Sequence, residues 1–231
     1  MISNMPNDGL ILAVDGPSGT GKSTTCRALA KQLDAKYVDT GAMYRVATLA
    51  VLREGVDPAD TAAVIAATAN LPLGVSDDPD STEVLLAGED VSRVIREDEV
   101  TRNVSAVSAI PEVRENLVAL QRKLAREAHR AIVEGRDIGT VVLADAPAKA
   151  FMTASAEVRA QRRQAQNEKA GIASDYETVL ADVQRRDAAD SSRKTSPLRP
   201  AEDATLVDTS NMSPEDVLEA LINVVKESVN D

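Results

Sequence analysis

The sequence has very few residues of the kinds that build disulfides, thiolate metal sites or imidazole-based catalysis. It contains one cysteine, one histidine and no tryptophan among 231 residues. A single cysteine excludes an intrachain disulfide and a metal site built from several thiolates. No apolar run approaches the roughly 18 residues that a membrane span needs, so we expect no membrane partner. The first ten residues lack the basic and apolar regions of a secretory signal, which favours a cytoplasmic protein.

Positive charge is also scarce. Lys and Arg number 26 against 37 Asp and Glu, a net charge of −11. Proteins that bind a phosphate backbone need a dense basic face, so we expect no nucleic-acid partner. The exception is the stretch 151–200, which contains nine basic and seven acidic residues. Such a stretch suits a small anionic ligand, although it is also typical of a solvated helix surface.

Short apolar runs alternate with helical patterns along the chain. The runs are 10–14, 36–38, 131–133, 149–152 and 205–207. Apolar residues between them recur at helical spacing, and a capping box over 174–177 precedes a further helix. This alternation predicts an α/β fold, a parallel sheet flanked by helices.

The stretch 71–107 departs from this rhythm. Strand-like segments flank a turn cluster at 77–80, a second turn follows at Gly88, and a polar helical segment comes next. We interpret 71–107 as a small inserted subdomain with its own hairpin. The core would then comprise residues 1–70 and 108–231.

The sharpest motif lies directly after the first apolar run and directly before the first helical pattern. Its residues are Gly16, Pro17, Ser18, Gly19, Thr20, Gly21, Lys22 and Ser23, which match G-x-x-x-x-G-K-[ST]. In this context the pattern predicts a phosphate-binding loop, a P-loop. Backbone N–H groups and the helix N-terminus favour phosphate, Lys22 reaches the outer phosphates, and the Ser23 hydroxyl can bind Mg²⁺.

The loop alone does not choose among kinases, GTPases, ATPases and motors. The sequence has no N-K-x-D motif for guanine and no D-x-x-G motif directly after the first βα unit, and it is short for a motor. A kinase acting on a small molecule is therefore favoured. Glu134, Asp137 and Asp39 are all candidates for the carboxylate that supports Mg²⁺.

Further motifs follow two of the apolar runs, at 39–45 and 134–140. The carboxyl ends of parallel strands meet at one edge of a sheet, so both motifs point toward the phosphate loop. Together with 88–92 and 111–114, they closely resemble the bacterial cytidylate kinases, a family of the nucleoside monophosphate kinase group. The resemblance runs from about residue 10 to residue 225, with the motifs in order.

The resemblance implies an enzyme that transfers a phosphoryl group from ATP to CMP, and also to dCMP, with Mg²⁺. It implies a monomer, an inserted subdomain that binds the nucleoside monophosphate, and a helical lid at about 155–170. It assigns the acceptor phosphate to Thr40, Arg45, Arg136, Arg186 and Arg193, the base to Ser105, Arg114 and Asp137, and the ribose to Asp190. Arg159, Arg162 and Arg163 match the lid over ATP. We therefore assign ATP binding to the eight loop residues, Thr24 and Arg163, and catalysis to Lys22, Arg159, Arg162 and Arg186.

The sequence departs from some family members at three positions. Ser23 and Thr40 replace Gly and Ser and keep or add a hydroxyl, whereas Ala189 stands where others carry Arg. The residue spacing agrees with the resemblance. Arg159 and its two lid partners share one helix face, as do Arg186, Asp190 and Arg193 if their helix continues.

Two alternatives stay open. The chain could be another small-molecule P-loop kinase, or a nucleotide sensor that regulates a partner without acceptor chemistry. In a kinase of this type the attacking phosphate oxygen is already anionic, so no strong general base is needed. We accordingly expect His129 and Cys26 to be structural.

Overall fold

The computed structural model describes residues 9–230. The N-terminal segment in which we expect no secretory signal lies largely outside the described residues. The elements of the first half are β1 (Leu10–Asp15), α1 (Lys22–Leu33), β2 (Lys36–Asp39), α2 (Thr40–Arg53), α3 (Thr61–Thr68), β3 (Leu73–Val75), β4 (Val84–Leu86), β5 (Glu89–Asp90), η1 (Val94–Arg96) and α4 (Asp98–Val107). Those of the second half are α5 (Pro111–Glu127), β6 (Arg130–Glu134), η2 (Ile138–Val142), β7 (Ala148–Thr153), α6 (Ala156–Lys169), α7 (Tyr176–Ser191), β8 (Thr205–Asp208) and α8 (Pro214–Asn230).

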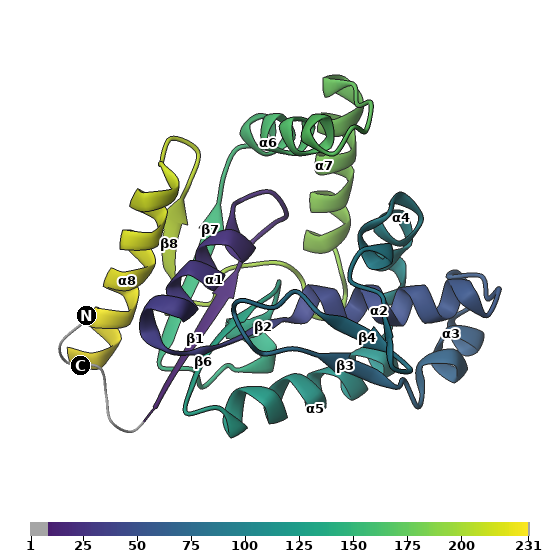
Figure 1. Cartoon of the computed structure of the whole chain (residues 1–231), viewed down its shortest axis with the longest axis horizontal. Helices are drawn as coiled ribbons and strands as arrows, with labels where there is room; N and C mark the ends of the chain where they lie inside the picture. The colour runs from purple at the N-terminus through teal and green to yellow at the C-terminus, as the bar shows by residue number, and fades with distance from the viewer. Residues whose placement is uncertain (1–8, 231) are drawn as a thin grey trace.

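The main sheet has five parallel strands in the order β2-β6-β1-β7-β8 (Figure 1). Each of these strands coincides with one of the five apolar runs, and helices cover both faces. The predicted α/β fold is therefore confirmed. β1 lies at the centre, where Leu12 pairs with Ile132 on one side and with Ala148 on the other.

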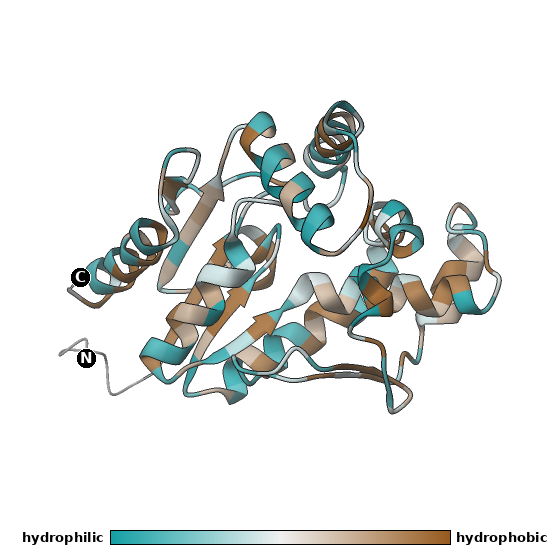
Figure 2. Ribbon diagram, turned by 45° about the horizontal axis from the view of Figure 1, so that its top comes forward, coloured by the Kyte–Doolittle hydropathy of each residue, from teal (hydrophilic) through white to brown (hydrophobic). Residues whose placement is uncertain are grey.

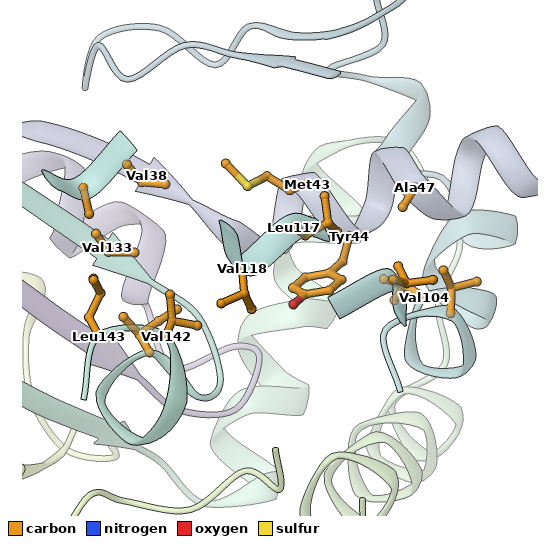
Figure 3. Packing of buried hydrophobic residues seen from close by; sticks show 14 of the residues in the cluster. Val38, Met43, Tyr44, Ala47, Val104, Leu117, Val118, Val133, Val142 and Leu143 are labelled. Carbon is orange, nitrogen blue, oxygen red and sulfur yellow. The ribbon is translucent and has the colours of Figure 1, made fainter. Parts of the chain in front are cut away.

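Alternate side chains of the sheet enter two hydrophobic clusters. Leu12 and Val14 pack with α1 and α8, whereas Ala13 packs with α2 and α5. The strands of this sheet are mainly brown, that is hydrophobic, in Figure 2. Figure 3 shows the second cluster, in which Met43 and Tyr44 of α2 lie with Leu117 and Val118 of α5.

Strands β3, β4 and β5, which lie between α3 and α4 along the chain, form a separate antiparallel sheet. Its buried residues Val84 and Leu86 join a cluster with Val46 and Leu49 of α2. A sheet this small cannot bury enough apolar surface by itself, so it depends on α2 for its core.

Two local predictions need correction. The first residue of the expected capping box is not the cap of α7, because Asp175 accepts the N–H of Thr178 at 2.9 Å instead. A carboxylate at a helix N-terminus also interacts favourably with the helix dipole. In addition, α7 ends at Ser191, so Arg193 lies beyond the helix and not on its face.

The carboxyl ends of β1, β2 and β6 meet at one edge of the main sheet. The phosphate loop and the motifs at 39–45 and 134–140 begin there, and Figure 1 shows α6 and α7 beside each other near the same edge. Within residues 9–230, no helix has the length and apolar character to cross a membrane.

Candidate active site

The phosphate loop packs closely against the end of β7 and the start of α6. Gly16 has a φ of +140°, and a Cβ there would lie 2.0 Å from the Met152 carbonyl oxygen. Gly19 has a φ of +84°, and its Cβ would lie 3.0 Å from the Cβ of Arg159. Glycine is needed at both positions because any side chain would strain the backbone or open these contacts.

Lys22 begins α1 and lies beneath the loop. Its Nζ donates to the carbonyl oxygens of Gly16 and Pro17, at 2.7 Å each. Arg136 donates to the same Gly16 oxygen at 2.9 Å. Burial, together with the nearby Arg136 charge, lowers the pKa of Lys22 to about 7. Two cations thus converge on one carbonyl of the loop, where they are placed to receive phosphate oxygens.

Ser23 is linked to the end of β6 by a short hydrogen bond. Its Oγ donates to Glu134 Oε1 at 2.6 Å, and the same oxygen accepts from Tyr37 Oη at 2.9 Å. The other oxygen, Glu134 Oε2, is buried and has no hydrogen-bond partner among the described residues. Burial and the Asp39 charge raise the pKa of this carboxyl group.

The other two carboxylates considered for Mg²⁺ have different contacts. Asp39 caps α2 by accepting the N–H of Ala42 at 2.9 Å. Asp137 forms an ion pair with Arg114. Of the three candidates, only Glu134 hydrogen bonds to Ser23. Residues 9–230 hold no group of three or more His, Cys, Asp and Glu side chains that could bind a metal.

Two buried charges face the site from α5 and from the segment after β6. The Arg114 and Asp137 side chains are each only 5% exposed, and Arg114 also donates to the Ser108 carbonyl at 3.2 Å. The Arg114 guanidinium lies 5.3 Å from the centre of the Tyr44 ring. Burial raises the pKa of Tyr44 to about 12, so its hydroxyl stays neutral beside this pair.

Asp190 connects two further arginines. One of its oxygens accepts from Arg136 at 3.1 Å and the other pairs with Arg193. Arg193 also donates to Ser108 Oγ at 3.2 Å. Arg186, one helical turn before Asp190, is half-buried, and burial and the Arg136 charge lower its pKa to about 9. A dense, positively charged group of this kind favours a bound dianion.

Three more residues that were predicted to bind the acceptor nucleotide lie nearby. Thr40 Oγ1 donates to the Glu134 carbonyl at 2.7 Å. Arg45 donates to the Ile95 carbonyl at 2.8 Å and to Thr101 Oγ1 at 2.9 Å, and burial lowers its pKa to about 10. Ser105 is half-buried on α4.

The arginines of α6 separate into two groups. Arg159 makes a two-point ion pair with Asp187 of α7 and donates to the Ser18 carbonyl at 3.3 Å. Arg162 donates to the Thr209 carbonyl at 2.6 Å and to the Gly19 carbonyl at 3.4 Å. Arg163 is exposed. The first two therefore join α6 to the loop, whereas the third is exposed and lies near enough to Arg45 that its charge, in addition to burial, lowers the pKa of that residue.

Several residues of this network are not among those predicted. Asp187 pairs with Arg159, Ser108 contacts Arg114 and Arg193, and Thr209 holds Arg162. Asp15, the last residue of β1, accepts the N–H groups of Ile138 and Gly139 at 2.8 Å each. The position of Asp15 directly before the loop motif was the only signal in the sequence that could have drawn attention to it.

Comparisons with known proteins place the chain in a family. The family described as "Cytidylate kinase" matches residues 12–227. A "Cytidylate kinase" from Corynebacterium glutamicum is 70% identical over 97% of this chain and 97% of that protein, and one from Corynebacterium efficiens is 67% identical with the same coverage. A gluconokinase structure from Sinorhizobium meliloti, 14% identical, covers 98% of this chain and 96% of its own with a TM-score of 0.52, which supports the fold alone. The sequence match, the phosphate loop and the buried arginine network agree, and the chain belongs to the cytidylate kinase family.

Proposed function

We propose that the protein transfers a phosphoryl group from ATP to CMP, and also to dCMP, giving CDP and dCDP. The observation that carries this proposal is the position of Arg136, which donates to Gly16 of the phosphate loop at 2.9 Å and to Asp190 at 3.1 Å. One guanidinium thus spans the donor and acceptor halves of the site. Phosphoryl transfer needs cationic groups between its two substrates, because charge on the transferring group must be neutralised.

On the donor side, the loop from Gly16 to Ser23, together with Thr24, binds the ATP phosphates. Lys22, Arg159 and Arg162, together with Arg186 of α7, neutralise charge on the transferring group. Arg163 contacts ATP. Lys22 Nζ donates hydrogen bonds to two carbonyl oxygens of the loop. Phosphate oxygens are stronger acceptors and can replace these carbonyls as its partners.

Mg²⁺ fits beside Ser23 and Glu134. The buried and unpartnered Oε2 of Glu134, adjacent to the Ser23 hydroxyl, supports this assignment. Hydroxyl, carboxylate and phosphate oxygens are the ligands that Mg²⁺ prefers. Held by Ser23 and Glu134, Mg²⁺ would neutralise charge on the ATP phosphates.

On the acceptor side, the arginine network receives the phosphate of CMP. Its members are Thr40, Arg45, Arg136, Arg186 and Arg193. Asp190 orients two of these arginines and contacts the ribose, while Ser105, Arg114 and Asp137 recognise the base. The attacking phosphate oxygen carries negative charge already, so these residues orient it and none needs to remove a proton.

Closure completes the proposed mechanism. We assign residues 71–107 to the subdomain that binds the monophosphate and residues 155–170 to a lid, with 1–70 and 108–231 as the core. The ion pair between Arg159 and Asp187 supports a common movement of α6 and α7, since it ties the two helices together. Closure would exclude water and limit hydrolysis of ATP. We further propose that the enzyme acts as a monomer in the cytoplasm, without nucleic-acid or membrane partners.

A coupled assay of ADP formation tests this function. The purified protein is supplied with ATP, Mg²⁺ and, one at a time, CMP, dCMP, UMP, AMP and GMP. We expect rapid turnover with CMP and dCMP only. A nucleotide sensor would instead hydrolyse ATP slowly, at a rate that CMP does not change. Another small-molecule kinase would use UMP, AMP or GMP in place of CMP, or none of the five.

A further inference from the structure

Tyr37 is a buried residue of β2 that lies outside every motif of the site. Its side chain is 1% exposed, and its register partner in the sheet is Ile132 of β6. The phenol nevertheless reaches the proposed metal site, because Oη donates to Glu134 Oε1 at 2.9 Å. A hydrophobic residue would fill the same volume, so the hydroxyl needs an explanation beyond packing.

The two carboxylate oxygens of Glu134 differ in their hydrogen bonds. Oε1 accepts both from Tyr37 Oη and from Ser23 Oγ at 2.6 Å, whereas Oε2 is left with no partner among residues 9–230. Two donors on one oxygen fix the rotation of a carboxylate about its last bond. The free oxygen is thereby held in one direction. Partners of this kind orient metal ligands in many metal sites.

Tyr37 is itself held from the other side by the turn that joins β3 to β4. Its backbone N–H donates to the Asp77 carbonyl at 2.8 Å. The guanidinium of Arg27 lies over the ring, 4.3 Å from its centre, and donates to the carbonyls of Pro79 at 3.2 Å and of Ser81. The ring is therefore enclosed between α1 and this turn, which leaves its hydroxyl little freedom to turn away from Glu134.

We propose that Tyr37 is a positioning residue for the metal-binding carboxylate of Glu134, and that the turn at 76–83 keeps it in place through Arg27. This inference rests on the proposed assignment of Mg²⁺ to Ser23 and Glu134. The phenol suits this role because its hydroxyl donates to Glu134 Oε1 while the ring stays buried against α1.

The test measures how strongly Mg²⁺ tightens the binding of ADP. Calorimetry gives the Kd of ADP with and without Mg²⁺, and the ratio of the two is compared among variants. We expect Tyr37→Phe to reduce this ratio by about ten-fold, the lower end of the usual effect of removing a partner of a metal ligand. Binding of ADP without Mg²⁺ should be unchanged. Tyr176→Phe is the matched control, since it removes a phenolic hydroxyl outside the site and should leave the ratio at the wild-type value.

Two further variants separate the possible outcomes. Glu134→Gln tests the proposed metal assignment, and a wild-type ratio in that variant would overturn the assignment itself. If Glu134→Gln lowers the ratio and Tyr37→Phe does not, the metal assignment stands and the role of Tyr37 is refuted. Equal weakening of ADP with and without Mg²⁺ in Tyr37→Phe would also refute it, because that pattern indicates general structural damage.

Arg27→Met keeps the test decisive if Tyr37→Phe folds poorly. Arg27 is half-buried, and the variant leaves the phenol intact while removing the group that lies over its ring. We expect a decrease of the ratio in the same direction and smaller in size. A ratio identical to that of the wild type would contradict the proposed role of the turn.

Discussion

Arg114 and Asp137 form an ion pair that is almost completely buried, with each side chain 5% exposed. Breaking such a pair by removing one partner leaves an uncompensated charge and costs about 3–5 kcal/mol of stability. In the proposed function the same two residues recognise cytosine. Their substitution therefore affects stability and selectivity together, and the two effects must be measured separately.

Asp137→Asn should reduce turnover of CMP by about ten- to a hundred-fold, the value of one lost hydrogen bond to a charged group. Cytosine offers an amino donor beside two acceptors, whereas uracil presents an acceptor where the amino group stood. The carboxylate of Asp137 should therefore favour CMP over UMP, and the variant should lose much of that preference. The measurement is kcat/KM for both substrates at a temperature well below unfolding.

Equal decreases of kcat/KM for CMP and UMP would contradict this role and indicate that Asp137 only stabilises the fold. Asp137→Ala is a second variant, which removes the whole carboxylate group. Thermal or urea unfolding should show that it is less stable than Asp137→Asn, because an amide can still accept a hydrogen bond from Arg114.

Lys22→Ala should lower the rate of transfer by about 10²-fold or more, since it removes a charged group from the transferring phosphate. The fold should survive, because burial already opposes the charge of this ammonium. Circular dichroism checks the fold and the coupled assay checks the rate. Lys31→Ala is the control on the same helix, where an exposed lysine pairs with Asp80. Near-normal turnover in folded Lys22→Ala would refute the assignment of the loop.

Asp15→Asn should change how stability depends on pH. Burial raises the pKa of Asp15 from 3.8 to about 6. Between these values the folded state holds a proton that the unfolded state has lost, so the wild type loses stability as pH rises through this window. Asparagine does not titrate. The free energy of unfolding of the wild type, relative to the variant, should therefore fall by about 2 kcal/mol between about pH 4 and pH 7.

Urea unfolding at several pH values measures this difference. A constant difference between wild type and variant would show that Asp15 keeps an ordinary pKa. The variant should also raise the KM for CMP, because an amide has one oxygen in place of the two that accept the N–H groups of Ile138 and Gly139, the residues directly after Asp137.

Hydrogen exchange should distinguish the lid from the core. In the free protein, amides of 155–170 should exchange faster than those of β1, and they should gain protection when a bisubstrate analogue joining adenosine and cytidine occupies both halves. Asp187→Asn should weaken this gain, since it removes the ion pair with Arg159. Equal protection of 155–170 in the free and bound protein would contradict a lid.

Local patterns in the sequence predicted the parts of the molecule that depend on local chemistry. The five strands and the helix after the phosphate loop follow from apolar periodicity and from the loop motif. Glu134 could be named only as one of three candidates, because the choice depends on which carboxylate approaches Ser23 in the folded chain. Ser108 and Thr209 act mainly through backbone carbonyls or single hydroxyls, and these groups carry no distinctive sequence signal.

The central position of β1 has a consequence for how the chain folds during synthesis. β1 is synthesised well before its two neighbouring strands, because Leu10 pairs with Arg130 and Leu12 with Ala148. Until β6 and β7 have been made, this apolar segment has no partner on either side, and the loop that follows it has no Met152 to pack against. Pairings between such distant residues are slow to form and leave hydrophobic strands exposed in the meantime. We therefore expect the nascent chain to leave the apolar residues of β1 unpaired until β6 and β7 have been synthesised.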